Sequence, residues 1–253
     1  MAGTPAYLPL ARRKYGHMAV ADDTEAVIDG FTRSACVFAA VAFQQAQPRP
    51  VRLAHLLHAP SHLIAAVERD LPCLVTVREP EAAVVSCVIR EPYLSPAVVL
   101  DAWTRFYSKL LPHRDGMVVG DFARVTTDLG SLIDELNGRF GTTFTPFHHT
   151  PENVERVFAF IEERATRPAY EEHIGRYMSG LETAAELDDA RRSSIGQGRR
   201  SAVPFEHRVS RPSAARQEVR AALVARYQEP GLAPRRARAE RLYGAFAGES
   251  PPR

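Results

Sequence analysis

The chain alternates short apolar runs with longer segments whose apolar residues recur at helical spacing. The first pattern predicts buried strands and the second predicts amphipathic helices. Predicted strands cover residues 25–30, 51–54, 73–77 and 117–119, and predicted helices cover residues 34–45, 61–69, 80–90, 96–110, 129–140 and 151–165. Strands that alternate with helices are typical of parallel βαβ units. We therefore expect an α/β fold with a doubly wound, mainly parallel sheet flanked by helices.

The two ends of the chain have a weaker pattern. Residues 1–24 are polar and predict irregular structure, while residues 186–215 are rich in arginine and serine and predict a loop. Residues 217–227 and 235–246 predict two surface helices. We expect a single domain over residues 1–253, with a core at about 24–168 and a loop-rich, helical extension over 169–253.

Composition narrows the class of protein. The 253 residues carry a formal net charge of only +2, so nothing indicates a general nucleic-acid-binding surface. Almost all basic residues are arginines, which suit bidentate binding of phosphate, although a compositional bias of the genome explains them equally well.

The cysteines and the hydropathy of the chain indicate where in the cell the protein is expected. Cys36, Cys73 and Cys87 lie apart in apolar surroundings, without metal-ligand spacing, and predict reduced core thiols. The N-terminus has no signal-peptide run, and no segment approaches the roughly 20 apolar residues of a membrane span. We expect a cytoplasmic protein with no membrane partner.

The strongest candidate for chemistry is an arginine–serine pair. The predicted strand 73–77 is followed by Arg78, Pro80 opens a helix, and Ser86 lies on that helix. Anionic ligands bind at the carboxyl ends of parallel strands. The pair therefore predicts phosphate recognition; the alternative is that Arg78 pairs with a nearby acid and Ser86 fills a small gap.

Two other loops reach the same predicted edge. Residues 30–36 form a strand-to-helix turn in which backbone N–H groups and Arg33 could hold a phosphate, although an ordinary connection is the alternative. The Walker pattern is absent, which argues against an ordinary ATPase or GTPase. His55, His58 and His62 follow the second strand, where a histidine can act as a general base, and their spacing does not predict a zinc site.

Together these motifs resemble those of PAPS-dependent sulfotransferases, which use 3′-phosphoadenosine 5′-phosphosulfate. Residues 28–34 look like the family's opening phosphosulfate loop, where Pro-Lys/Arg-Ser-Gly-Thr-Thr is typical. Residues 77–80 with Ser86 resemble its 3′-phosphate motif, and His58-Ala59-Pro60 is similar to its catalytic His-x-Pro. The order and intervals also fit, over roughly residues 24–145.

The resemblance implies a P-loop-like sulfotransferase fold and transfer of a sulfuryl group from PAPS to a hydroxyl or amine of a small-molecule acceptor, with PAP as product. His58 would be the base, and Arg78 and Ser86 would hold the 3′-phosphate, without a metal. The phosphosulfate would bind Arg33 and the loop residues Ser34, Ala35, Cys36 and Val37.

The chain departs from the family pattern in this loop. Ala35 stands where a glycine is usual, and Cys36 and Val37 stand where two threonines are usual. A hydrogen bond to a charged group is worth about 1.5–3 kcal/mol, so the loss of two hydroxyls would weaken donor binding. One alternative is therefore a catalytically weakened, sulfotransferase-like nucleotide-binding protein, and a less favoured one is a P-loop small-molecule kinase.

Several further features leave alternatives open. The identity of the acceptor and the formation of a homo-oligomer are both undetermined. The aromatic residues Trp103, Phe106 and Tyr107 predict core packing or, less often, an acceptor pocket. Candidates for a C-terminal 3′-phosphate contact are residues 198–200, Arg208 and Arg211.

Overall fold

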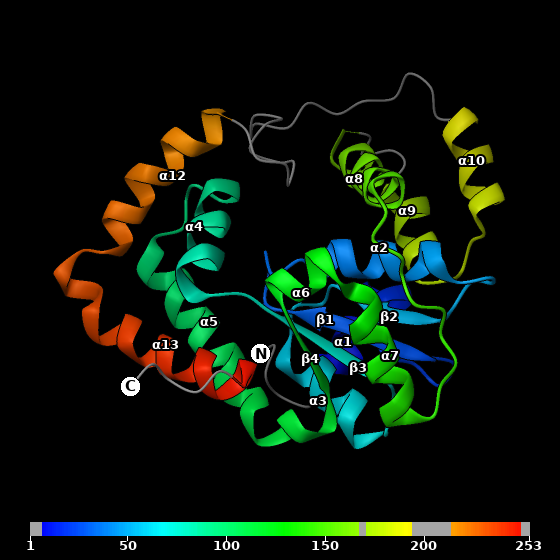
Figure 1. Ribbon diagram of the computed structural model, residues 1–253, viewed down its shortest axis with the longest axis horizontal. Helices are drawn as coiled ribbons and strands as arrows, with labels where there is room; N and C mark the ends of the chain where they lie inside the picture. The colour runs from blue at the N-terminus through cyan, green and yellow to red at the C-terminus, as the bar shows by residue number, and fades with distance from the viewer. Residues whose placement is uncertain (1–6, 167–170, 194–213, 249–253) are drawn as a thin grey trace.

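The computed structural model describes residues 7–166, 171–193 and 214–248 (Figure 1). Its strands are β1 (Ala26–Gly30), β2 (Leu53–His55), β3 (Cys73–Val77) and β4 (Val118–Asp121). Its α-helices are α1 (Tyr7–Lys14), α2 (Cys36–Ala46), α3 (Pro60–Glu68), α4 (Pro80–Arg90), α5 (Pro96–Leu110), α6 (Phe122–Thr127), α7 (Leu129–Phe140), α8 (Pro151–Thr166), α9 (Glu171–Met178), α10 (Ala184–Ser193), α12 (Ala214–Tyr227) and α13 (Ala233–Ala247). Short 3-10 helices are η1 (Gly16–Met18), η2 (Leu111–Gly116) and η4 (Pro230–Leu232).

The four strands form one parallel sheet in the order β2-β1-β3-β4. The α/β class predicted from the alternation of elements is therefore confirmed. The connection from β2 to β3 passes over β1, so the direction of winding reverses between β1 and β3. In open α/β sheets, ligands bind at the carboxyl ends of the strands beside such a reversal.

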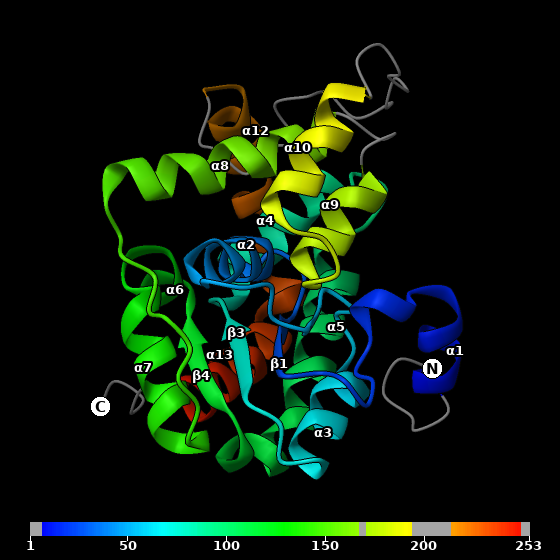
Figure 2. The ribbon, with the colours of Figure 1, turned by 90° about the vertical axis from the view of Figure 1, so that its right-hand side faces the viewer.

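Helices cover both faces of the sheet because successive strand residues point in opposite directions. Val27 and Val75 pack on one face in a core shared with α3, α4, α5, α12 and α13. Ile28 and Leu74 pack on the other face with α2, α7, α8 and α9. Figure 1 shows α4, α5, α12 and α13 on one side of the strands and α2, α7, α8 and α9 on the other, and Figure 2 looks onto the second of these layers, with α12 and α13 behind it.

Local sequence signals account for many element boundaries. The structure has β3, α4 and α7 at the predicted residues. Ser95 caps α5, its side chain accepting a hydrogen bond from Val98 N at 3.3 Å, and Pro96 takes the first helical position. Gly141 ends α7 in the left-handed conformation, with φ 65°.

Two predictions about the chain ends were wrong. Residues 1–24 contain α1, which packs through Ala11, and residues 184–193 form α10 where a loop was expected. The two C-terminal surface helices are present as predicted, with more of their described residues exposed than buried, and their buried faces join the core through Tyr227 and Phe246, which lie against α4 and α5. The candidate contacts at residues 198–200, Arg208 and Arg211 lie outside the described residues.

The aromatic stripe of α5 belongs to the core. Trp103, Phe106 and Tyr107 are all buried, and their rings pack against one another. The core alternative is therefore confirmed for these three residues. Among the described helices, none has the length and the apolar character needed to cross a membrane.

Candidate functional site

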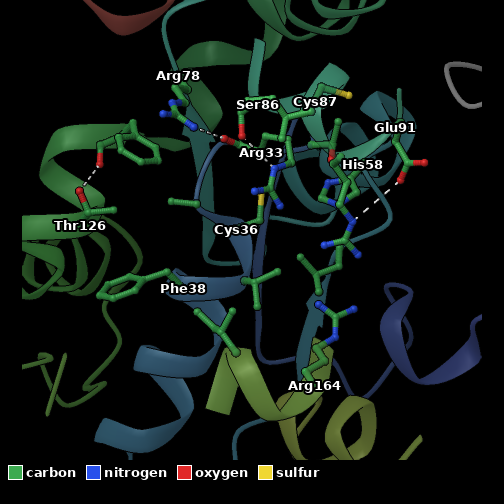
Figure 3. A pocket seen from close by; sticks show the side chains of 18 of the residues that line it. Arg33, Cys36, Phe38, His58, Arg78, Ser86, Cys87, Glu91, Thr126 and Arg164 are labelled. Atoms are coloured by element: carbon green, nitrogen blue, oxygen red, sulfur yellow. Dashed lines mark hydrogen bonds and ion pairs between the residues drawn. The ribbon is translucent and has the colours of Figure 1, made fainter. Parts of the chain in front are cut away.

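The three loops that leave the carboxyl ends of β1, β2 and β3 meet at one cavity of about 830 Å³. Most of the sequence-predicted site residues line it: Arg33, Ala35, Cys36, Val37, His58, Arg78 and Ser86. Ser34 is fully buried beneath the loop, so its side chain is not part of the lining. Figure 3 shows Arg33, Ser86 and His58 close together in this cavity.

Backbone strain is concentrated at this edge of the sheet. Five non-glycine residues in the described part of the chain have positive φ, and four of them lie in two of these loops: Arg33 at 69°, Ala35 at 68°, Leu56 at 55° and His58 at 49°. Such conformations cost of order 1–3 kcal/mol each and cluster at functional sites. Asp70, the fifth, lies in the turn after α3.

The close packing of β1 against β3 explains the glycine that opens the first loop. A Cβ at Gly30 would lie 2.2 Å from Thr76 O and 2.4 Å from Thr76 Oγ1. Tyr107 supports the same point, since its hydroxyl donates to Thr76 O at 2.8 Å and accepts from Phe31 N at 3.3 Å. The loop therefore starts from a rigid, tightly packed position.

Arg78 and Ser86, predicted to bind a phosphate together, line the same cavity but have different partners within the protein. Ser86 Oγ accepts a hydrogen bond from Arg33 Nε at 3.1 Å. Arg78 Nη1 instead donates to Arg33 O at 3.2 Å, and its guanidinium lies 3.9 Å from the ring centre of Phe122. Both arginines line the cavity, and Ser86 positions the first of them.

Asp29 is the residue that sequence reasoning missed. Its carboxylate is fully buried and accepts hydrogen bonds from Gly30 N at 2.8 Å, Leu57 N at 3.0 Å and His58 N at 3.0 Å. Burial alone would raise the pKa of Asp29, but hydrogen bonds from His58 and His62 outweigh it and hold this pKa well below its usual range. The signal was a carboxylate in an otherwise apolar strand, since aspartate is seldom fully buried without partners.

Of the three candidate histidines, only His58 lines the cavity, with a third of its side chain exposed. Its Nδ1 lies 2.8 Å from Gly30 O and 3.3 Å from Asp29 Oδ1. Burial opposes protonation of His58, but hydrogen bonds with Asp29 and Cys36 raise its pKa well above the usual value.

The other two histidines are structural. His62 is buried, with Nδ1 2.9 Å from Asp29 Oδ2 and Nε2 accepting from Val20 N at 3.2 Å. His55 is buried with Nε2 3.0 Å from Ser179 Oγ, and burial, then the charge of Arg164, lowers its pKa to about 3. The structure thus separates one cavity-lining histidine from two core histidines.

Asp29, Cys36 and His58 bring ligand-type atoms within 4.8 Å of one another. Each already has partners within the protein, since Cys36 Sγ lies 3.0 Å from Thr76 Oγ1 and Asp29 accepts backbone N–H groups. The cluster therefore works as a hydrogen-bond network around His58.

Comparison with known proteins finds no family model, no curated protein and no solved structure that matches this chain. The chemistry of the cavity is nevertheless specific. Arg33 and Arg78 lie beside the N-terminus of α2, where backbone N–H groups and the helix dipole favour anions. His58 adds a group that can accept or donate a proton at the same place.

Proposed function

We propose that the protein is a sulfotransferase with a P-loop-like sulfotransferase fold, which moves a sulfuryl group from PAPS to a hydroxyl or amine of a small-molecule acceptor. The observation that carries the proposal is the meeting of Arg33, Arg78 and His58 in one cavity at the N-terminus of α2. These are the three groups that phosphosulfate binding, 3′-phosphate binding and proton removal require.

The donor would bind through two anionic groups. The phosphosulfate would meet Arg33 and the backbone N–H groups at residues 34–37, where α2 begins. Arg78 would bind the 3′-phosphate, a group that ATP lacks, because a guanidinium matches phosphate in a bidentate manner. Ser86 would orient Arg33 rather than share the 3′-phosphate with Arg78.

The acceptor would be activated by His58. Because Gly30 O only accepts hydrogen bonds, Nδ1 of His58 must carry a proton, so Nε2 is the nitrogen that would receive the proton of the acceptor. The raised pKa of His58 favours the doubly protonated ring, so His58 would act as the base only in its neutral form, and transfer should increase as pH rises through that pKa. As the acceptor oxygen bonds to sulfur, the bond from sulfur to the bridging phosphate oxygen breaks. Arg33 would stabilise the negative charge that develops on the departing PAP.

Binding of PAP tests the donor site. We expect PAP to raise the melting temperature and to bind in calorimetry more tightly than ATP, and Arg78→Ala to abolish this binding. Arg105→Gln, an exposed change on α5, is the matched control and should leave PAP binding intact. Absence of PAP binding by the wild-type protein would overturn the proposal.

Transfer of radiolabelled sulfate from PAPS to a broad panel of hydroxyl and amine acceptors tests catalysis. We expect His58→Ala to keep PAP binding and to stop turnover. Tight PAP binding without any transfer would favour the nucleotide-binding alternative. Stronger stabilisation by ATP with magnesium would favour the small-molecule kinase.

A further inference from the structure

The cavity extends well beyond the loops assigned to the donor. The rest of its lining comes from the end of α4 and from α12 on one side and from α8 on the other (Figure 1). Figure 1 shows α4 and α12 on one side of the molecule and α8 on the opposite side. A second ligand in this part of the cavity would therefore touch two separate walls.

Both walls carry arginines. Arg90 and Arg220 line the cavity from α4 and α12, and Arg164 lines it from α8. Figure 3 shows Arg164 pointing toward the centre of the cavity, on the same side of Arg33 as His58, while Arg78 lies on the other side. These three arginines are thus additional to the pair assigned to the donor.

Few of the described acidic side chains line the cavity beside these arginines. Among the described residues that line the cavity, Glu91 is the single carboxylate, against five arginines. Glu91 lies 4.0 Å from Arg90, and both side chains are about 40% exposed, which makes a weak, solvent-screened pair. A cavity lined by one sign of charge concentrates ligands of the opposite sign.

The positive charge of Arg164 affects a histidine buried in the sheet. After burial, it is the main influence that lowers the pKa of His55, which lies in β2 below the cavity. Arg164 therefore lies close enough to β2 for its charge to act at the base of the cavity.

Apolar side chains lie between the charged ones. Met18, Leu56 and Ile161 line the cavity, and Leu56 and Ile161 are nearly buried. This lining suits a carbon skeleton, because apolar walls with a few placed charges orient a small molecule and select its polar groups.

We infer that the acceptor is an anionic amphiphile, with a hydroxyl at one end and a carboxylate or phosphate at the other, bound by Arg164 and Arg220. This inference rests on the proposed function for the identity of the reaction, but the preference for an anion can be measured as binding alone. Guanidinium groups bind carboxylate and phosphate alike, so both chemistries belong to the inference.

The experiment compares matched probes that share a skeleton. The probes are para-hydroxyphenylpropionate and ω-hydroxydecanoate, each with its amide, and the phosphate monoester of para-hydroxyphenylethanol with its neutral parent alcohol. Calorimetry is run on the full chain with and without PAP, and transfer from PAPS is then measured with the same probes. We expect at least one acid or phosphate to bind at least about tenfold more tightly than its neutral analogue.

Substitutions of the two arginines test whether they cause the preference for an anion. Arg164→Gln and Arg220→Gln should each reduce the anion preference several-fold and leave PAP affinity unchanged, while Arg105→Gln should alter neither. Equal or tighter binding of the amides, no binding of any anion, or an unchanged preference in both variants would overturn the inference. Anion preference without sulfuryl transfer would support the inference and count against the proposed function only.

Discussion

The carboxylate of Asp29 accepts hydrogen bonds from the backbone N–H groups of Leu57 and His58, and so holds the turn in which Leu56 and His58 have positive φ. The same carboxylate lies beside the imidazole of His58. One buried side chain therefore sets both the backbone and the protonation of the candidate base.

Replacing Asp29 by asparagine tests this role. The Asp29→Asn change removes the negative charge of the carboxylate and places an amide N–H group against the backbone donors that the carboxylate accepted from. Breaking a buried ion pair of this kind lowers the free energy of unfolding by about 3–5 kcal/mol. We expect urea unfolding to show a loss of that size. Asp22→Asn, at a fully exposed side chain, is the control and should change stability by less than about 0.5 kcal/mol. If Asp29→Asn lowered the free energy of unfolding no more than the control does, the Asp29 carboxylate would not stabilise this turn.

The pH dependence of stability follows from His58 and Asp29. The raised pKa of His58 contributes stability that is complete below about pH 6.5 and is lost as pH rises through the folded-state value. The depressed pKa of Asp29 contributes stability above about pH 3.9 that is lost as pH falls. We expect the free-energy difference between wild type and His58→Asn to be largest at about pH 5–6 and to shrink as pH rises through the raised folded-state pKa of His58, as measured by urea unfolding. A difference that is constant or grows with pH would contradict the pairing.

At the scale of elements, the loop between β1 and α2 carries strain that a sequence pattern does not show. Ala35 is the N-cap of α2 and adopts φ 68° and ψ 16°, and Arg33 has φ 69°. A left-handed conformation costs an L-residue roughly 1–2 kcal/mol. The loop keeps this shape because Gly30, Phe31 and Thr76 are tightly packed below it.

A glycine at position 35 tests the effect of this strain. Ala35→Gly removes the steric cost but adds about 0.5–1 kcal/mol of backbone entropy, so stability should stay within about 1 kcal/mol of wild type. Affinity for PAP should rise, because a Cβ is removed where the 5′-phosphate of PAP would approach. Ala35→Val should lose more than about 1 kcal/mol, since β-branched residues adopt this conformation poorly. Calorimetry with PAP and urea unfolding check both variants; weaker PAP binding in Ala35→Gly would contradict this account.

Elements with strong local signals were predictable. β3 is a continuous apolar run, α4 begins at a proline, and α7 ends at Gly141. The contacts inside the site were not predictable, because they depend on loop conformations that no local pattern encodes. Ser86 bonds to Arg33, which lies 53 positions earlier in the chain, and Asp29 bonds to a loop that follows a different strand.

At the scale of the whole molecule, helix α13 is linked to the candidate site through a chain of contacts. Phe246 of α13 packs on Tyr107 of α5, with ring centres 5.0 Å apart, and Arg114 Nε donates to Phe246 O at 2.7 Å. Tyr107 in turn bonds to Thr76 O and Phe31 N, beside the loop that would hold the donor. As its arginine-rich sequence predicts, α13 is a surface helix, and its few apolar residues complete the core.

Truncation of Phe246 tests whether this C-terminal helix is part of the folded core. Because the ring is fully buried, Phe246→Ala should cost about 3–5 kcal/mol in urea unfolding, within a single cooperative transition. Val98→Ala on the exposed face of α5 should cost less than about 0.5 kcal/mol. We also expect weaker PAP binding in Phe246→Ala, since Tyr107 loses the ring that packs against it. A separate early transition, with the main transition and PAP binding unchanged, would instead show that α13 is an appendage on a core that folds without it.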